Sequence, residues 1–508
     1  MRARYPHPKS LPSGKGLAFA LSDSISGVSQ VRNLTNKFTD FRPIIQQQQT
    51  KSRNFMAVMK KVLIITYYWP PTGGSGVQRW VKFSKYLPQF GWQPIIYTPE
   101  NPEMTSVDKT LEEDIPKEAV VIKRHITEFY TLYHKLTGKK DATKEEVNPI
   151  NNQKKTFKQK LMLFLRGNLF IPDPRVTWVN PSVRFLKKYL KENHVDAIVS
   201  TGPPQSMHLI ARRLSKATGI PWVADFRDPW TKMFYFKHLC LCGWAERRHH
   251  KLEKQVLDDA SVVVAVSPLV QEEFQAMTGT PVELITNGFD DDDFSQVVEP
   301  DGYFNVTHTG LFASDGNPEI IWQALAEKCR QDAEFDKMLR IRLVGKTDNE
   351  IIASILAAGL GSHLVNLGYQ NHNVAVREQK NASLLILPLR KEPEYRATLP
   401  GKLFEYLASM NPILGIGQTD GAMARIVNQT KTGVVFGWED KSSVSAYIDL
   451  CWRNFKDADD YEDIQVEHSG ETDLSEILER NDKAETIRQF SRKALTARMA
   501  DLLNSLTK

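Results

Sequence analysis

The stretch LPGKLFEYLASMNPILG, residues 399–415, combines a tight glycine turn, a short helix and a strand in one segment. Gly401 forms the turn, Lys402 lies in the first helical turn, and Glu405 follows three residues later on nearly the same face. A helix amino end offers free N–H groups and a partial positive charge, to which Lys402 adds a full cation. Such an end suits a diphosphate, and the two oxygens of Glu405 suit a ribose diol. The stretch therefore predicts a nucleotide-diphosphate site inside an α/β fold.

Short β-rich runs alternate with longer amphipathic segments along the rest of the chain. The expected strands of a first series are 62–66, 94–97, 120–123, 197–200, 222–225, 262–266 and 282–284, and those of a second series are 304–308, 340–344, 364–367, 384–387, 413–415 and 434–436. Helices are expected between them, for example at 183–192 and 206–218. This order predicts two doubly wound, Rossmann-like domains with parallel sheets, facing a cleft at the carboxyl ends of their strands.

Turn signals and composition set the expected domain boundaries. The Asn287-Gly288 turn marks the join, so we expect an N-terminal domain at 59–288 and a C-terminal domain at 289–483. An apolar helical stripe predicts a final helix within 484–508 that packs back on the first domain. Residues 1–58 are rich in Gln, Ser and basic residues, which predicts a disordered leader, with a transit peptide as the alternative.

Overall composition narrows the function classes. A chain of 508 residues is too long for one compact core. The net charge of +6 is too weak to indicate a nucleic-acid partner, but it fits contact with an anionic membrane or with nucleotides. The four cysteines show no metal-binding spacing and favour a reduced, cytosolic setting. No apolar run approaches the length of about 18 residues that a membrane-spanning helix needs.

A glycine-rich loop, Gly73-Gly74-Ser75-Gly76, follows the first expected strand. Its glycines allow the backbone to approach a ligand closely. The dinucleotide-binding fingerprint needs a further glycine where Arg79 stands, and the P-loop signature is absent, so neither site is predicted. A flexible connection without a binding role is the alternative.

Together, the loop at 73–76, the Asn287-Gly288 turn and the segment GKLFEY at 401–406 resemble the retaining glycosyltransferases of family 4, which have the GT-B fold. The resemblance extends over about residues 60–508. Within the family, the chain looks most similar to the bacterial enzymes of cell-surface polysaccharide synthesis, which have segments like STGPP at 200–204 and DFRDPW at 225–230.

The resemblance implies a nucleotide-sugar donor bound by the C-terminal domain and an acceptor bound on the N-terminal side. Carried over, Glu405 holds the ribose, and Lys402 with the turn at Gly401 and Leu403 meets the diphosphate. The other donor-binding residues that it implies are Gly74, Ser75, Gly76, Asn287 and Gly310. No cofactor and no divalent metal is implied, because the helix dipole and cations take the role of the metal.

Three positions depart from the family pattern. Ala397 stands where the first of two glutamates is common, Leu311 where an arginine is usual, and Arg227 where many relatives have a histidine. The charge of the diphosphate must then be balanced by other cations. The candidates, each of which is alternatively a solvated surface charge, are Lys346, Arg390 and Arg396.

Asp225, Arg227 and Asp228 end an expected strand at the cleft and are our catalytic candidates. Two carboxylates and a guanidinium group would orient an acceptor hydroxyl and balance oxocarbenium charge. A structural ion-pair network is the alternative. The acidic run at 290–293 follows a turn, so we interpret it as a solvated linker rather than a metal site.

The basic, amphipathic segment 154–166 predicts a helix in a membrane interface, with packing on its own domain as the alternative, and aromatic residues at 233–236 add to this surface. We predict a cytoplasmic enzyme, peripheral on the inner face of the plasma membrane. It would transfer a sugar, with retention of configuration, to a hydroxyl acceptor such as a lipid-linked surface glycan. The alternatives are a GT-B-like sugar-nucleotide epimerase and a non-catalytic sugar-nucleotide-binding protein.

Overall fold

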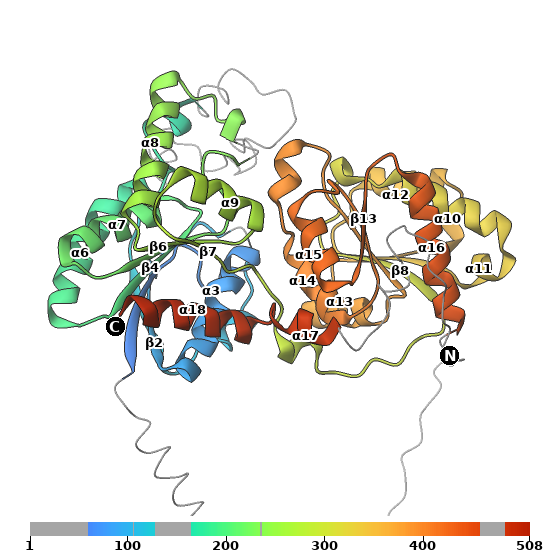
Figure 1. Ribbon diagram of the computed structural model, residues 1–508, viewed down its shortest axis with the longest axis horizontal. Helices are drawn as coiled ribbons and strands as arrows, with labels where there is room; N and C mark the ends of the chain where they lie inside the picture. The colour runs from blue at the N-terminus through green and yellow to red at the C-terminus, as the bar shows by residue number, and fades with distance from the viewer. Residues whose placement is uncertain (1–58, 105, 128–163, 234–235, 458–482, 508) are drawn as a thin grey trace, which may run out of the picture. The chain divides into compact units, whose positions relative to one another are not determined.

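The computed structural model describes residues 59–104, 106–127, 164–233, 236–457 and 483–507, so the expected leader at 1–58 lies outside the described residues. The strands in the described part form two parallel sheets (Figure 1). The first sheet has seven strands in the order β3-β2-β1-β4-β5-β6-β7, and the second has six in the order β10-β9-β8-β11-β12-β13. Both orders are doubly wound, because the sequence of strands reverses its direction at β1 and again at β8.

Each of the thirteen expected strands is present, with both ends within two residues of the expected ones. The strands of the first sheet are β1 Lys60–Ile65, β2 Trp92–Pro99, β3 Val120–Arg124, β4 Ala197–Gly202, β5 Trp222–Phe226, β6 Val262–Ala265 and β7 Val282–Leu284. Those of the second are β8 Phe304–Thr309, β9 Leu339–Val344, β10 Leu364–Gly368, β11 Leu384–Pro388, β12 Ile413–Ile416 and β13 Gly433–Phe436.

Helices connect these strands. In the first half they are α3 Ser75–Tyr86, η1 Leu87–Phe90, η2 Thr110–Glu112, α6 Val176–Glu192, α7 Ser206–Thr218, η4 Phe236–His238, α8 Gly243–Asp259 and α9 Pro268–Met277. From the linker onward they are η5 Asp291–Phe294, η6 Ser314–Gly316, α10 Glu319–Gln331, α11 Ala333–Met338, α12 Asn349–Ala357, η7 Gly361–His363, α13 His372–Lys380, η8 Pro393–Ala397, α14 Gly401–Ser409, α15 Ala422–Thr430, α16 Lys441–Lys456, α17 Lys483–Arg488 and α18 Arg492–Leu506.

Helix α6 begins seven residues earlier than expected at 183, and it continues through Pro181. Its first turns bury Trp178 and Val179 in the core, both about 2% exposed. That apolar burial offsets the one backbone hydrogen bond that a proline removes from a helix.

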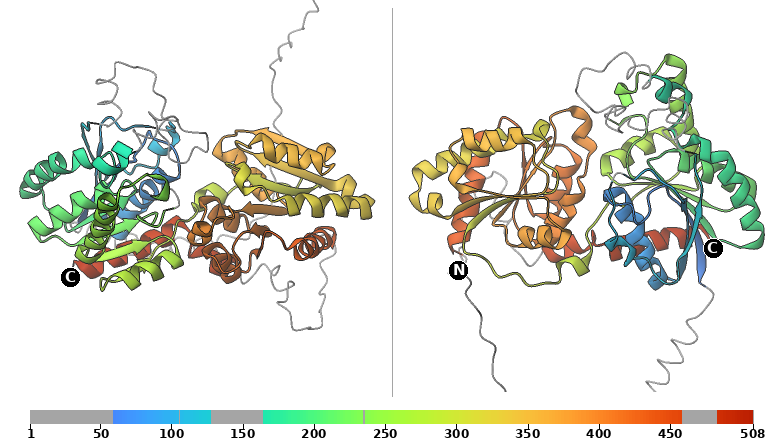
Figure 2. Two further views of the ribbon diagram at one scale, coloured as in Figure 1. Left: turned by 90° about the horizontal axis from the view of Figure 1, so that it is seen from above. Right: turned by 180° about the vertical axis from the view of Figure 1, so that it is seen from behind.

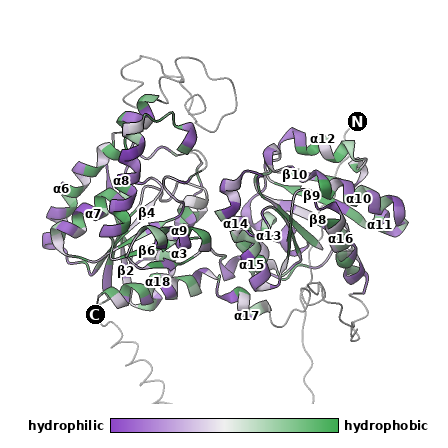
Figure 3. Ribbon diagram, turned by 45° about the horizontal axis from the view of Figure 1, so that its top comes forward, coloured by the Kyte–Doolittle hydropathy of each residue, from purple (hydrophilic) through white to green (hydrophobic). Residues whose placement is uncertain are grey.

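Alternate residues of the central strands face two separate hydrophobic cores. Leu63 and Ile65 of β1 belong to one core of the first domain, and Val62 and Ile64 belong to the other. The second domain repeats the pattern along β11. Helices accordingly lie on both faces of each sheet (Figure 2), and hydrophobic residues concentrate in the strands (Figure 3). This is the arrangement expected for fully covered parallel sheets.

The C-terminal helix α18 packs on the first domain, as predicted. Leu495, Met499 and Leu503 are fully buried in the core that contains Val62 of β1 and Trp80 of α3. The chain that leads into α18 is held beside the segment that joins the two domains, because the backbone of Ser491 pairs with that of Phe289. Among the residues that the structure describes, no helix is long and apolar enough to span a membrane.

Candidate active site

The two reversals of strand order place two loops where doubly wound folds bind ligands. Gly74, at the end of the loop after β1, and Gly76, in the first turn of α3, follow β1, which lies between β2 and β4 in the sheet. Gly310 follows β8, which lies between β9 and β11. Ligands bind outside the carboxyl ends of the strands at such reversal points. Predicted residues from both domains therefore lie at the correct ends of their sheets.

In the second domain, Lys402 meets the loop after β8. Its Nζ lies 2.9 Å from Nε2 of His308 and 3.1 Å from the carbonyl oxygen of Leu311. Burial lowers the pKa of Lys402 to about 8. Burial and the nearby ammonium hold the pKa of His308 well below its usual range, so the histidine is neutral and accepts the hydrogen bond. Gly310 turns the loop towards the lysine with a φ of 88°, which favours glycine.

Glu405 lies one helical turn after Lys402 and is anchored through one oxygen. Gln379 of α13 donates to Glu405 Oε2 at 2.8 Å, and the same amide group donates to Thr309 Oγ1 at 2.9 Å. Tyr406 accepts a hydrogen bond from the backbone N–H of Thr309 at 2.9 Å. These contacts fix α13 and α14 against the end of β8, and they orient the Glu405 carboxylate. Sequence reasoning missed Gln379, which belongs to no recognisable motif.

The other predicted cations differ in their surroundings. Lys346 is exposed directly after β9. Arg390 pairs with Asp315 at 2.8 Å, and Arg396 pairs with Asp420 at 2.8 Å. The structure thus brings Lys402 and Gly310 together, whereas the two arginines already have carboxylate partners. Leu311, at the position where an arginine is usual, is 62% exposed.

In the first domain, Asp225 is fully buried and pairs with Arg79 rather than with Arg227. The Arg79 Nη2–Asp225 Oδ1 distance is 2.7 Å, and neither side chain is exposed. Trp80 Nε1 and Thr201 Oγ1 donate to Oδ2 of the same carboxylate. Burial raises the pKa of Asp225, but the charge of Arg79 outweighs it, and the pKa lies below its usual value. Both oxygens are therefore used inside the domain.

Arg79 itself joins three separate segments. Its Nη1 and Nη2 donate to the carbonyl oxygens of Thr286 and Ile285 at 2.7 and 2.8 Å, and Asn287 Oδ1 lies 3.5 Å from Nη1. The predicted donor residue Asn287 is thus held beside the guanidinium group that neutralises Asp225. In the sequence, Arg79 stood out only as the residue that breaks a glycine fingerprint.

Arg227 binds backbone rather than either aspartate. It donates to the carbonyl oxygens of Gly76, at 2.5 Å, and of Pro203, so it ties the first turn of α3 to the loop that follows β4. A Cβ at Gly76 would lie 2.6 Å from Arg227 Nη1, which explains the glycine. Gly74, with a φ of 101°, precedes the first turn of α3, which begins at Ser75. Asp225 and Arg227, two of the three catalytic candidates, are therefore each held by a structural partner elsewhere in the domain rather than by one another.

Asp228 has a different environment from Asp225. It is partly buried, and none of the residues that the structure describes donates a hydrogen bond to its carboxylate. Burial raises the pKa of Asp228 to about 6, against the opposing charge of Arg227. A carboxylate of this kind, placed just after β5, retains the capacity to receive a hydroxyl proton or hydrogen bond.

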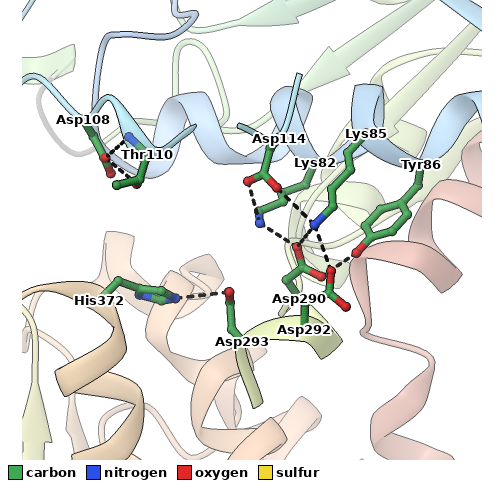
Figure 4. A network of polar contacts seen from close by, with 10 residues as sticks. All are labelled: Lys82, Lys85, Tyr86, Asp108, Thr110, Asp114, Asp290, Asp292, Asp293 and His372. Atoms are coloured by element: carbon green, nitrogen blue, oxygen red, sulfur yellow. Dashed lines mark hydrogen bonds and ion pairs between the residues drawn. The ribbon is translucent and has the colours of Figure 1, made fainter. Parts of the chain in front are cut away.

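In the acidic run after the Asn-Gly turn, Asp291 and Asp292 are exposed, as expected of a solvated linker, whereas Asp290 is not (Figure 4). Asp290 is 3% exposed, and it accepts hydrogen bonds from Lys82 at 2.6 Å and from Tyr86 at 2.5 Å. Burial raises the pKa of Asp290, but these contacts lower it to about 2. Asp293 instead reaches His372 of α13 at 3.1 Å. The run therefore connects helix α3 with the second domain.

Arg492, at the start of α18, is a second residue that sequence reasoning missed. It is 5% exposed, and its Nη1 has no hydrogen-bond partner among the described residues. Burial lowers the pKa of Arg492 to about 9, and Asp290 and Glu405 are close enough to raise it in part. A buried guanidinium group with one unsatisfied nitrogen thus lies within electrostatic range of the predicted ribose-binding carboxylate.

Part of the expected membrane surface lies outside the described residues, namely 154–163 and 234–235. Beside them, Phe164, Leu169 and Trp244 are 43%, 68% and 61% exposed. The Oδ1 of Asn168 accepts a hydrogen bond from the Cys242 N–H at 2.7 Å, which ties the segment that begins at Phe164 to the start of α8. The exposed basic residues on the following turns of α8 include Arg247, Arg248 and Lys251.

Comparison with known proteins agrees with this architecture. Residues 151–293 match the model of Glycosyltransferase Family 4. No curated protein sequence matches the chain. A glycosyltransferase from Rickettsia africae has a similar structure, with a TM-score of 0.55 and 14% identity over 89% of this chain and 99% of that one.

Two further solved structures show the same fold. An α,α-trehalose-phosphate synthase (UDP-forming) from Burkholderia vietnamiensis gives a TM-score of 0.55 and 10% identity over 89% of this chain and 99% of that one. A lipopolysaccharide outer core galactosyltransferase in its apo form gives 0.51 and 13%, over 88% and 99%. At such identities the likeness establishes the fold, and the family match adds the sequence relationship. The chain therefore has the GT-B fold that the sequence predicted, and its residues 151–293 are similar in sequence to glycosyltransferase family 4.

Proposed function

We propose that this protein transfers a sugar from a nucleotide-diphosphate sugar to a hydroxyl acceptor, with retention of configuration. The observation that carries the proposal is the arrangement around Lys402. A lysine ammonium held by a neutral His308 and a carbonyl oxygen stands at the amino end of α14, beside the Gly310 turn. This geometry concentrates positive charge and free N–H groups at one point, which suits a diphosphate.

Glu405 is the proposed ribose ligand. Gln379 holds one of its oxygens, and the carboxylate is left with acceptor capacity for a diol. Arg492 contributes a buried cation on the same side of the linker, within electrostatic range of Glu405. In this proposal, the charge of the nucleotide is balanced by protein groups, so the transfer itself needs no divalent metal or other cofactor.

Asp228 is the proposed acceptor-side group. A partly buried carboxylate near the loops held by Arg227 would orient the attacking hydroxyl through a hydrogen bond. We propose front-side attack, in which the departing diphosphate takes up the hydroxyl proton and the carboxylate favours developing positive charge on the sugar. Asp225 then acts as a positioning residue, because its oxygens are occupied by Arg79, Trp80 and Thr201.

The proposed acceptor is a lipid-linked glycan at the inner face of the plasma membrane. Exposed Trp244 precedes the exposed basic residues of α8, and Leu169 is exposed as well, a combination that suits an anionic bilayer surface. Liposome co-sedimentation tests this part. Wild-type protein should sediment with anionic vesicles and not with neutral ones, and Trp244→Ala with Leu169→Ala should reduce the bound fraction. Equal binding to both vesicle types would contradict it.

The donor site is tested by thermal unfolding with a panel of nucleoside diphosphates. A ligand that binds only the folded protein raises the melting temperature. One nucleotide should raise it in wild type, and Lys402→Ala and Glu405→Ala should abolish the shift. Lys441→Ala, which removes only an exposed ion pair with Glu327, is the matched control and should keep it.

The outcomes separate the alternatives. A shift that survives in both site variants would overturn the assigned donor site. A shift without any product from sugar nucleotide and acceptor would favour a non-catalytic binding protein, whereas isomerised donor without acceptor would favour an epimerase. Activity that a chelator removes and Mn²⁺ restores would refute metal-independent transfer.

A further inference from the structure

Three side chains with the chemistry of a transition-metal site meet in the second domain, away from the donor site. They are Cys329 of α10, Asp336 of α11 and His363 of η7, and one ligand atom from each lies within 4.8 Å of the other two. His363 Nε2 lies 3.1 Å from Asp336 Oδ1. We expected no metal site from the cysteines, because the three residues are scattered in the sequence.

The surrounding fold fixes the positions of these three side chains. Phe335, next to Asp336, is fully buried, and it anchors the short helix α11 against the core. His363 is 7% exposed, and its backbone N–H donates to Leu360 at 3.1 Å. Cys329 of α10 is partly buried, whereas the Asp336 side chain is 52% exposed. The buried residues thus hold the cluster in place, and the exposed Asp336 opens it to solvent, which gives an ion a route of entry.

We propose that Cys329, Asp336 and His363 bind a divalent transition metal ion of the zinc type, with water as the fourth ligand. Thiolate, imidazole and carboxylate ligands suit Zn²⁺ and disfavour Ca²⁺ or Mg²⁺. Zinc lies about 2.0–2.3 Å from such ligands, so tetrahedral coordination needs ligand atoms about 3–4 Å apart. The distance from His363 Nε2 to Asp336 Oδ1, 3.1 Å, lies in this range, and all three ligand atoms lie within 4.8 Å of one another. Binding releases the thiol proton to solvent.

The location of the cluster gives the ion a structural role rather than a catalytic one. Asp336 lies just before β9, and His363 lies just before β10, and these neighbouring strands are parallel. The cluster therefore lies at the amino ends of the strands. The Gly310 turn and Lys402 lie at the carboxyl ends, on the opposite edge of the sheet. A bound ion would crosslink α10, α11 and η7, and it would stabilise the second domain without contacting the donor.

Titration of the chelator-treated full chain with Co²⁺ tests the proposal, because Co²⁺ substitutes for Zn²⁺ and is visible. Wild type should show d–d bands and a thiolate-to-cobalt charge-transfer band that Zn²⁺ removes. Cys329→Ser should lose the charge-transfer band, and Asp336→Asn, at an exposed position that does not threaten folding, should weaken Co²⁺ binding at least tenfold. The matched control is Cys240→Ser with Cys242→Ser, which removes two exposed thiols and should keep both bands.

A stability measurement gives a second readout. Zn²⁺ should raise the melting temperature of wild type and of the control double variant, but not that of Cys329→Ser. Absence of cobalt bands in folded wild type, or bands that persist in folded Cys329→Ser, would overturn the proposal. The nucleotide-induced thermal shift should survive in Cys329→Ser, so failure of the metal site and failure of the donor site are distinguishable.

Discussion

Replacement of Asp225 by asparagine tests the assignment of the two aspartates that flank Arg227. Asp225 and Arg79 are both fully buried, with 2.7 Å between Oδ1 and Nη2. The asparagine would leave the guanidinium group buried without its counter-charge, and an amide N–H₂ would face the donors around it. Removal of one partner from a buried pair costs about 3–5 kcal/mol. With a urea dependence of about 3 kcal/mol/M, the midpoint of unfolding should fall by about 1–2 M.

The same substitution should change the response to acid. Pairing with Arg79 keeps the pKa of Asp225 below its usual value in the folded protein. Its stabilisation is therefore present above the pKa of the unfolded chain, about 4, and is lost as pH falls through the lower folded pKa. Asp225→Asn should not show this loss of folding stability in acid. Urea unfolding followed by near-ultraviolet circular dichroism at several pH values measures both effects.

Asp228→Asn is the matched control, because it removes a carboxylate three residues away that has no hydrogen-bond donor among the described side chains. Burial disfavours this charge, so its removal should leave the free energy of unfolding within about 0.5 kcal/mol of wild type. Turnover should fall nevertheless. The reasoning is refuted if Asp225→Asn unfolds at the wild-type urea concentration, or if Asp228→Asn shows the same loss of stability.

Two further predictions concern pH. Burial lowers the pKa of Lys402 to about 8, so the affinity for a nucleoside diphosphate, measured by calorimetry, should fall as pH rises through that value. In Lys402→Arg the affinity should stay level, because arginine keeps its charge, and a level wild-type profile would contradict the role of the ammonium. Burial raises the pKa of Asp228 to about 6, so kcat/KM should rise with pH through about 6. In Asp228→Asn, kcat/KM should no longer rise with pH through about 6. An unchanged rise in that variant would show that another group is responsible for it.

The fold was predictable because parallel strands buried on both faces form short apolar runs between turn residues. The expected strands match the observed ones from β1 to β13. The start of α6 was wrong, because a local rule treats Pro181 as a boundary, whereas burial of Trp178 extends the helix across it. Tertiary packing decides such cases, and a single sequence does not show it.

Only part of the candidate site was predictable, for a related reason. Lys402 and Glu405 belong to one helical turn, so their spacing alone brings them together. Gln379, which orients Glu405, comes from another helix, and Arg492 comes from the end of the chain. Such partners meet only after the chain has folded. The buried state of Asp290 was missed for the same reason, since Lys82 reaches it from more than two hundred positions away.

Arg79 shows most clearly why a missing motif is informative. In dinucleotide-binding folds, the third glycine of the fingerprint allows a helix to pack closely on a strand. Here the same position carries an arginine that spans from α3 to Asp225 at the end of β5 and to the carbonyl oxygens that follow β7. A small residue would leave Asp225 buried without its counter-charge, so the glycine and the ion pair exclude each other. The end of β5 in the first domain therefore holds a neutralised carboxylate, and the groups that we predict to bind the diphosphate lie in the second domain around Lys402.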